Sequence, residues 1–168
     1  MKNFYLIIAF FTSILSFGQS KTELLPNGTF PPVEETISPM TNEKFLDATK
    51  IWIAEFSRNE FDITEVTENS LTIDAFRDNA FVYSNRGETF THKIKYQLKI
   101  AKTGNRYSAT FKVTEIHTKK TMLTYNMANY FTSEGKLKEV FEDVKPSMDR
   151  TANIILSSYY KYISGYKN

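Results

Sequence analysis

Apolar and polar residues alternate strictly in the middle of this chain. Between residues 93 and 100 the apolar positions are Ile94, Tyr96, Leu98 and Ile100, and lysine or glutamine fills the positions between them. A period of two sends successive side chains to opposite faces, so this stretch predicts a β-strand with one buried and one solvated face. The period continues over 106–113, whereas Ile116 falls out of phase and predicts a bulge or the end of a strand. Turn-forming residues at 103–105 join the two strands into a hairpin.

Three further stretches are rich in β-branched and aromatic residues and are bounded by turn formers. They cover residues 61–66, 71–77 and 80–84, and the turn clusters lie at 68–70, 78–79 and 85–87. Short connections of this kind join antiparallel neighbours. The sequence therefore predicts consecutive antiparallel strands between residues 61 and 116.

A helical period of three to four residues appears on both sides of this strand region. In the first helix, predicted over 41–58, the apolar stripe is Phe45, Ala48, Trp52 and Phe56, with Thr41 as N-cap. In the second, the stripe is Met148, Ala152, Ile155, Tyr159 and Tyr162, with Ser147 as N-cap and an end near Gly165. Both patterns are amphipathic, which is typical of helices that lie on a sheet. Trp52 is predicted to be a core anchor.

The first eighteen residues have the features of a secretory signal peptide. Lys2 supplies a positive charge, an apolar run follows over 4–15, and Ser16, Phe17 and Gly18 fit the small-x-small pattern of a cleavage site. The run is shorter than the about 20 residues that span a bilayer, and no other stretch comes near that length. We expect residues 1–18 to be removed and the chain from Gln19 onward to be exported, to the periplasm or outside the cell, without a transmembrane segment.

Two segments carry less regular patterns. Prolines are concentrated in residues 19–40, which predicts an extended lead-in before a single α+β domain over 41–168. Within this lead-in, residues 33–37 could pair as an edge strand, since flanking prolines confine a strand to an edge. Residues 118–145 stay largely unassigned, and 121–131 could be a strand or an irregular excursion.

Composition and charge narrow the classes of function. The chain has no cysteine, so it can hold neither a disulfide nor a lipid-modified N-terminal cysteine. Removing residues 1–18 takes away one lysine and no acidic residue, which lowers the formal net charge from +2 to +1. A nearly neutral chain lacks the long-range field of a nucleic-acid binder, and no nucleic-acid partner is predicted.

These elements predict an α+β fold in the order β-α-β-β-β-β-β-α, with an antiparallel sheet of about five or six strands and two helices packed on one face. The signal peptide, the proline-rich lead-in, the run 44–53 and the strand 94–100 followed by 104–107 resemble domain of unknown function 4468. That resemblance implies an exported protein of a Gram-negative bacterium with a fold like that of the TATA-binding protein (TBP-like). It implies no activity, cofactor or site residue, and DNA binding does not follow from the name of a fold.

A basic stripe is expected on the solvated face of the central hairpin. Its members are Lys93, Lys95, Lys99, Lys102, Arg106 and Lys112. Nucleic-acid binding would require aromatic rings on the same face, but Tyr96 and Tyr107 belong to the buried phase. An ordinary solvated face is one interpretation, and contact with acidic glycans or lipid headgroups at the cell envelope is the other.

The two histidines define a second candidate site. His92 and His117 lie at matching ends of neighbouring strands, so they are expected near each other, and Tyr125 and Tyr130 are placed with them in a candidate pocket. Paired imidazoles suit a metal or an acid/base site. No nearby Asp, Glu or further His completes a ligand set, so we predict neither a metal, a cofactor nor a catalytic residue. Tyrosines, including the C-terminal group at 159, 160, 162 and 166, could also line a sugar- or peptide-binding groove.

Two hypotheses of different class follow. The first is an exported, non-enzymatic binding or interaction module of the bacterial cell envelope, which contacts an envelope protein or glycan through the solvated sheet face or residues 118–145. The alternative is a small exported hydrolase or ligand-binding protein with a pocket near His92 and His117. No G-x-S-x-G, H-E-x-x-H or paired-carboxylate signature is present, so the enzyme hypothesis rests on composition alone.

Overall fold

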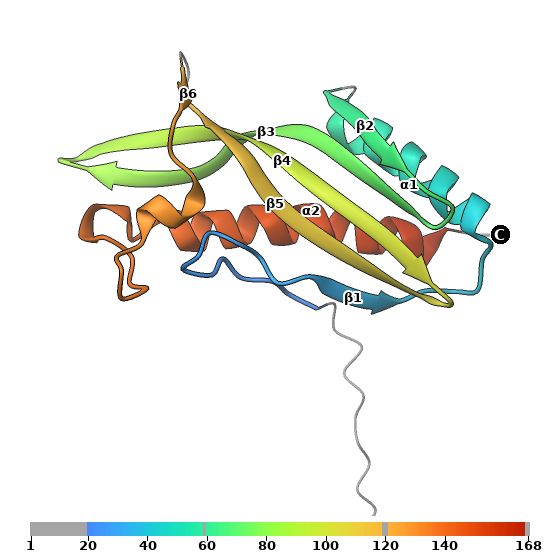
Figure 1. The fold of residues 1–168 in the computed structure, drawn as a ribbon. Coiled ribbons are helices and arrows are strands. Elements are labelled where there is room, and N and C mark those ends of the chain that lie inside the picture. The colour runs from blue at the N-terminus through green and yellow to red at the C-terminus, as the bar shows by residue number, and fades with distance from the viewer. Residues whose placement is uncertain (1–19, 59, 119–120, 167–168) are drawn as a thin grey trace, which may run out of the picture.

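A computed structural model of the chain describes residues 20–58, 60–118 and 121–166. The predicted signal peptide lies outside the described residues. The elements in chain order are β1 (Val33–Thr36), α1 (Asn42–Ser57), β2 (Phe61–Val66), β3 (Ser70–Asn85), β4 (Glu88–Thr103), β5 (Arg106–His117), β6 (Met122–Leu123), the 3-10 turns η1 (Met127–Tyr130) and η2 (Glu139–Phe141), and α2 (Val144–Gly165) (Figure 1).

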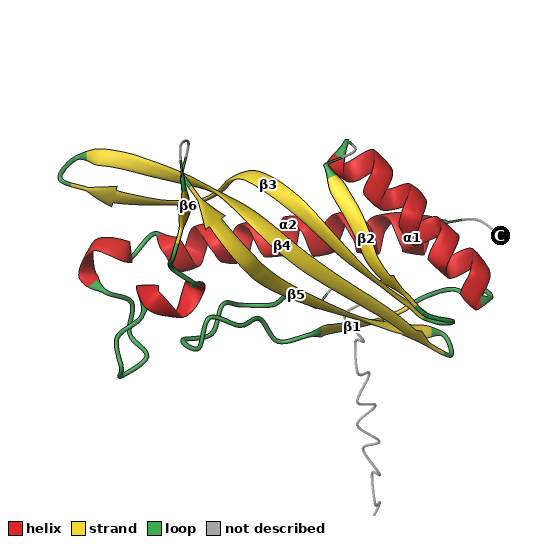
Figure 2. Ribbon diagram, turned by 45° about the horizontal axis from the view of Figure 1, so that its top comes forward, coloured by secondary structure: helices red, strands yellow, loops and turns green. Residues whose placement is uncertain are grey.

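All strands belong to one antiparallel sheet with the order β1-β5-β4-β3-β2, and the short β6 pairs with the end of β5 (Figure 2). Both helices lie on the same face, because Tyr107 of β5 contacts Phe45 of α1 and Tyr159 of α2. Trp52 of α1 is 2% exposed and packs on Tyr159, so the predicted core anchor is confirmed. The predicted α+β fold with two helices on one face of an antiparallel sheet is also confirmed.

Strand β3 corrects the prediction of two separate strands over 71–77 and 80–84. The register passes from Arg77 opposite Ile94 to Phe81 opposite His92, so residues 78–80 face Lys93 alone. Asn79 has φ of +50°, a value that asparagine tolerates better than most residues. The turn formers at 78–79 therefore form part of a bulge inside one long strand. A bulge inserts extra residues and increases the local twist, but the strand continues beyond it.

Of the two alternatives predicted at Ile116, a bulge or the end of the strand, the structure shows a bulge. Lys95 pairs with Glu115 and Tyr96 with Val113, which leaves the intervening Thr114 as the extra residue. This extra residue shifts the alternation of side chains by one position, so Ile116 points to the buried face and is 1% exposed.

The predicted N-cap is correct for α1 and wrong for α2. Thr41 caps α1 through a hydrogen bond that its hydroxyl accepts from the amide of Lys44, as predicted. The prediction that Ser147 caps the second helix is wrong, because α2 begins four residues earlier, with Asp143 at the N-cap position. The Ser147 hydroxyl instead donates to the carbonyl of Asp143 and accepts from the amide of Val82 in β3.

The lead-in packs against the rest of the fold. Strand β1 is an edge strand on β5, as predicted for residues 33–37. Leu24, Phe30 and Val33 are each at most 5% exposed and join the same hydrophobic core as the helices. Gly28 has φ of +79°, and a Cβ there would lie 2.6 Å from the amide of Ala128, so this glycine permits close approach of the lead-in to η1.

Candidate functional site

One face of the sheet is not covered by either helix, and we call it the open face. The predicted basic residues of the hairpin, except Lys102, lie on it. Lys93, Lys95 and Lys99 alternate with buried positions of β4, and Arg106 and Lys112 pair opposite solvent-facing positions of the same strand. Lys102 is the exception. It is 6% exposed, points to the helical face, and donates a hydrogen bond to the side chain of Asn42.

The cations of the open face are largely compensated by carboxylates. Arg106 pairs with Glu34 at 2.9 Å and Lys99 with Glu65 at 3.7 Å. The ammonium group of Lys95 lies 3.5 Å from Glu115 and 4.0 Å from Asp74, and that of Lys93 lies 3.2 Å from Asp78 and 3.6 Å from Glu60. Of the five predicted basic residues, Lys112 alone has no ion pair among the described residues. The open face is therefore a lattice of paired charges, which does not favour an anion-binding surface.

A single exposed ring interrupts this lattice. Phe76 is 36% exposed and lies 4.8 Å from the ammonium group of Lys93 and 5.9 Å from that of Lys95. Partial desolvation lowers the pKa of Lys93, but its contacts with Asp78 and Glu60 outweigh this effect and raise that pKa above its usual value. The ammonium group thus stays charged over the ring.

The two histidines lie on opposite faces of the sheet, which contradicts the prediction of a shared pocket. His117 pairs with Lys93, so the backbones of the two histidines are near each other as expected. Successive residues of a strand point to opposite faces, however, and His117 lies on the open face beside Phe76 and Glu115, whereas His92 lies on the helical face. Strand alternation therefore prevents the two imidazoles from acting on one ligand.

The other predicted pocket residues do come together with His92. They form a cluster that we call the aromatic end, where the β3–β4 hairpin extends beyond the neighbouring strands. Its members are Phe81, Tyr83, Phe90, His92, Tyr125, Tyr130 and Phe141. These rings come from β3, β4, the segment before η1, η1 itself and η2, so residues 118–145 supply part of the cluster.

Four rings of the aromatic end are stacked in a row along the hairpin. Phe81 lies 4.8 Å from His92, His92 lies 5.4 Å from Tyr83, and Tyr83 lies 5.1 Å from Phe90. The interplanar angles are 6°, 25° and 16°, respectively. Phe81 is fully buried and Phe90 is 36% exposed, so the row leads from the core to solvent.

A second row of rings crosses the first at Tyr83. Phe141 contacts Tyr83 at 4.9 Å and Tyr130 at 5.0 Å, and Tyr130 contacts Tyr125 at 6.5 Å, all edge to face. Tyr130 is 2% exposed whereas Tyr125 is 55% exposed. Val140, which precedes Phe141, is 42% exposed. The exposed apolar residues of the elements that carry these rings are Phe90, Tyr125 and Val140, and we call them the rim of the aromatic end.

His92 is the polar residue inside this cluster. It is 4% exposed, and its Nδ1 has no hydrogen-bond partner among the described residues. Burial lowers the pKa of His92 below its usual value of 6.5, so the ring is neutral at neutral pH. No group of three or more His, Asp or Glu side chains converges in the part of the chain that the structure describes.

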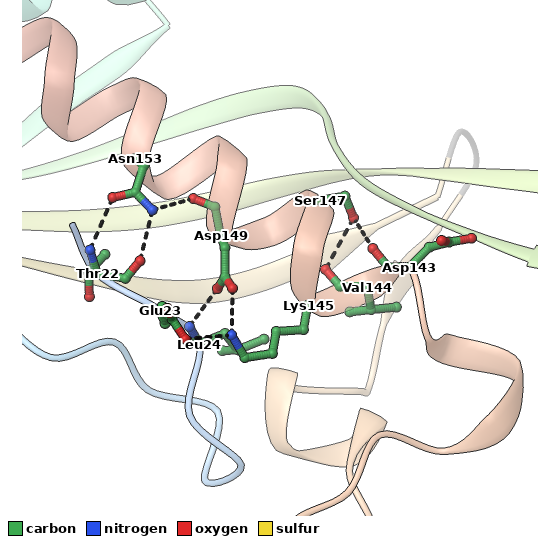
Figure 3. Close-up of polar contacts among 9 residues, drawn as sticks. All are labelled: Thr22, Glu23, Leu24, Asp143, Val144, Lys145, Ser147, Asp149 and Asn153. Atoms are coloured by element: carbon green, nitrogen blue, oxygen red, sulfur yellow. Dashed lines mark hydrogen bonds and ion pairs between the residues drawn. The ribbon is translucent and has the colours of Figure 1, made fainter.

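A second region, which the sequence did not predict, joins the lead-in to α2 (Figure 3). The side-chain amide of Asn153 accepts from the Thr22 amide at 3.0 Å and donates to the Thr22 carbonyl at 2.8 Å. Asp149 accepts from the Leu24 amide at 2.6 Å, and Lys145 lies between Asp149 and Glu23. Beside these contacts lies a recess of about 790 Å³ along the outward side of α2, which we call the α2 groove.

One sequence signal could have pointed to this second region. Lys145, Asp149 and Asn153 are spaced four residues apart, which places three polar side chains on one side of the helix next to the apolar stripe. The helix thus uses one side for the core and another for the lead-in. Among the described residues, no helix combines the length and apolarity needed to cross a membrane.

Comparison with known proteins finds similar structures but no similar sequence. No family model matches the chain, and no curated protein is similar to it. The fold is similar to that of a DUF4468 family protein from Bacteroides ovatus, with a TM-score of 0.58 and 12% identity over 84% of this chain and 89% of that one. It is also similar to a TBP-like protein from Parabacteroides distasonis, with a TM-score of 0.61 and 11% identity over 82% of this chain and 93% of that one. The chain therefore has the TBP-like fold that its resemblance to domain of unknown function 4468 implied.

Proposed function

We propose that this chain is an exported, non-enzymatic binding module of the cell envelope, and that the aromatic end is the surface through which it binds an envelope protein. The observation that carries the proposal is the exposed rim of Phe90, Tyr125 and Val140 on a fixed aromatic base. Large contiguous apolar patches on the surface of folded proteins mark interaction sites. Tyrosine and phenylalanine are also enriched among residues that dominate interface energies.

The base of the aromatic end supports this role because it holds the rim in place. Tyr83 touches three other rings of the cluster, and Tyr130 is nearly fully buried beneath Tyr125. Rim side chains that are already ordered lose little conformational entropy when a partner binds. The open face is less suited to binding a partner protein, because most of its charges are paired within the chain. A partner would have to break or desolvate these pairs.

Export is supported by the N-terminal pattern of Lys2, the apolar run and Ser16-Phe17-Gly18. The cleavage position at Gln19 is tested by the intact mass of the protein recovered from the envelope fraction. A mass that includes residues 1–18 in the exported protein would contradict it.

The binding surface is tested by photo-cross-linking in intact cells. A benzophenone amino acid is placed at Tyr125 on the rim or, as a control, at Ile51, which is 44% exposed on α1. We expect one defined cross-linked protein from position 125 and none from position 51. The double variant Phe90→Ser and Val140→Ser, which changes only exposed side chains, should remove this product while leaving the fold intact.

Three results would contradict the proposal. Equal cross-linking from both positions would indicate random collisions, and an unchanged product in the double variant would exclude the rim. Loss of the product on adding a soluble envelope glycan, with direct binding of that glycan, would assign the surface to carbohydrate instead of protein.

A further inference from the structure

The α2 groove carries basic side chains that have no partner within the chain. Its wall and floor include Lys21, Arg150, Asn153, Ile154, Ser157 and Lys161. Lys21, Arg150 and Lys161 are exposed, and none of them makes an ion pair or side-chain hydrogen bond among the described residues. The groove thus differs from the open face, where four of the five predicted cations are paired.

Two acidic residues, Glu23 and Asp149, also line the groove, but they do not compensate these cations. Asp149 accepts hydrogen bonds from the Leu24 amide and from Lys145, and Glu23 pairs with the same lysine. Partial burial lowers the pKa of Lys145, but its bonds to Asp149 and Glu23 outweigh this effect and raise it. Both carboxylates are therefore used in holding the lead-in, which leaves the groove with a local excess of positive charge.

The same side of α2 already binds an extended polypeptide. Asn153 contacts both the amide and the carbonyl of Thr22, which is recognition of the backbone and not of a particular side chain. Thr22 and Leu24 are at most 2% exposed, so this segment of the lead-in is packed into the fold beside α2. This side of α2 and the lead-in together line the α2 groove.

From this combination we infer that the α2 groove is a binding site for an extended acidic peptide segment of a partner protein. Arg150 and Lys161 lie three helical turns apart, which is about 16 Å along the axis. About five residues of extended chain cover that length. Carboxylates at the two ends of such a segment would meet Arg150 and Lys161, and Ile154, 45% exposed between them, would contact an aliphatic part of the segment. The site shares no residue with the aromatic end, so it does not depend on the function proposed above.

The inference is tested by fluorescence anisotropy with protein purified from its native host. The probe is a fluorescein-labelled peptide of about five glutamates, and the matched peptide of glutamines is the neutral control. We expect saturable binding of the glutamate peptide only. The variant Arg150→Glu with Lys161→Glu should weaken it about tenfold or more, as expected for loss of two charge-assisted contacts.

A charge-matched variant separates the groove from general electrostatics. Lys44→Glu with Lys112→Glu changes the net charge by the same amount at two exposed lysines that have no described ion pair and lie outside the groove. Binding should be retained in this variant. An equal loss in both variants would overturn the inference, as would no binding of the glutamate peptide. Binding of a polyuronate but not of the peptide would also overturn it and would assign the groove to an acidic glycan.

Discussion

The β3–β4 hairpin has two halves that are stabilised in different ways. In the half next to β2 and β5, strands flank the hairpin on both sides, and Ile73, Leu98 and Ile100 are fully buried beneath the helices. Beyond the bulge at 78–80, neither β2 nor β5 continues, and the hairpin is held by ring contacts and by α2. A single pair of strands thus serves as core in one half and as a platform for exposed rings in the other.

Helix α2 completes the second half by covering the free edge of β3. Thr151 is buried and donates to the carbonyl of Ala80, and Ser147 accepts from the amide of Val82. Unpaired backbone groups at a strand edge invite pairing with another chain, and natural proteins cover or distort such edges. The comparison teaches that a two-stranded extension can stay ordered without further strands when a helix supplies hydroxyl groups to its edge.

The largest expected effect comes from the core half. Leu98→Ala removes a fully buried side chain between its partners Ile73 and Phe111. We expect the free energy of unfolding to fall by about 3 kcal/mol, because such a cavity closes only partly. Chemical denaturation measures the loss, with the exposed Val66→Ala as control. A change below about 1 kcal/mol would show that this half is not the main core.

A smaller effect is expected at the covered edge. Thr151→Val keeps the shape of the side chain but leaves the Ala80 carbonyl without its donor. Stability should fall by about 1 to 2 kcal/mol, the cost of an unsatisfied buried group. Thr110→Val on the open face is the matched control, since its hydroxyl has no described partner, and it should leave stability unchanged. If the two variants behave alike, the edge is not held by α2.

The smallest effect depends on pH and is confined to the aromatic half. Because burial lowers the pKa of His92, protons bind the unfolded chain in preference to the folded one. The contribution of His92 to stability is complete well above its usual value of 6.5 and decreases as the pH falls below that value. His92→Phe keeps a ring in the stack and removes this titration, so its melting temperature should vary less than that of the wild type between pH about 7.5 and about 5.5. Parallel curves for the two proteins would contradict the prediction.

Sequence patterns predicted the core half much better than the aromatic half. Period-two alternation and helical spacing are patterns of residues that are close in sequence, so they predict the bounds of β4, β5 and α1 closely. The start of α2 was missed because serine is a favoured N-cap, although Pro146 signalled a first turn, where a missing amide hydrogen bond costs nothing. The bulge was mistaken for a turn since asparagine and aspartate favour both.

The candidate site was harder because its parts are distant in sequence. The structure brings His92 and Tyr130 into one cluster, as predicted. Strand length predicts that His117 lies near His92 along the sheet, but it does not determine which face of the sheet each side chain occupies. The α2 groove was not foreseen, because pairing of the lead-in with Asn153 leaves no periodic trace in the lead-in itself.

The contact between Thr22 and Asn153 spans 131 positions of the chain. A polypeptide is synthesised from its N-terminus, so Thr22 emerges well before its partner Asn153 on α2. Contacts of such long sequence separation slow the approach to the native state, since the intervening chain must be ordered first. The segment around Thr22 therefore cannot bind α2 until the intervening strands and α2 itself have been synthesised, although β1 can pair with β5 before that.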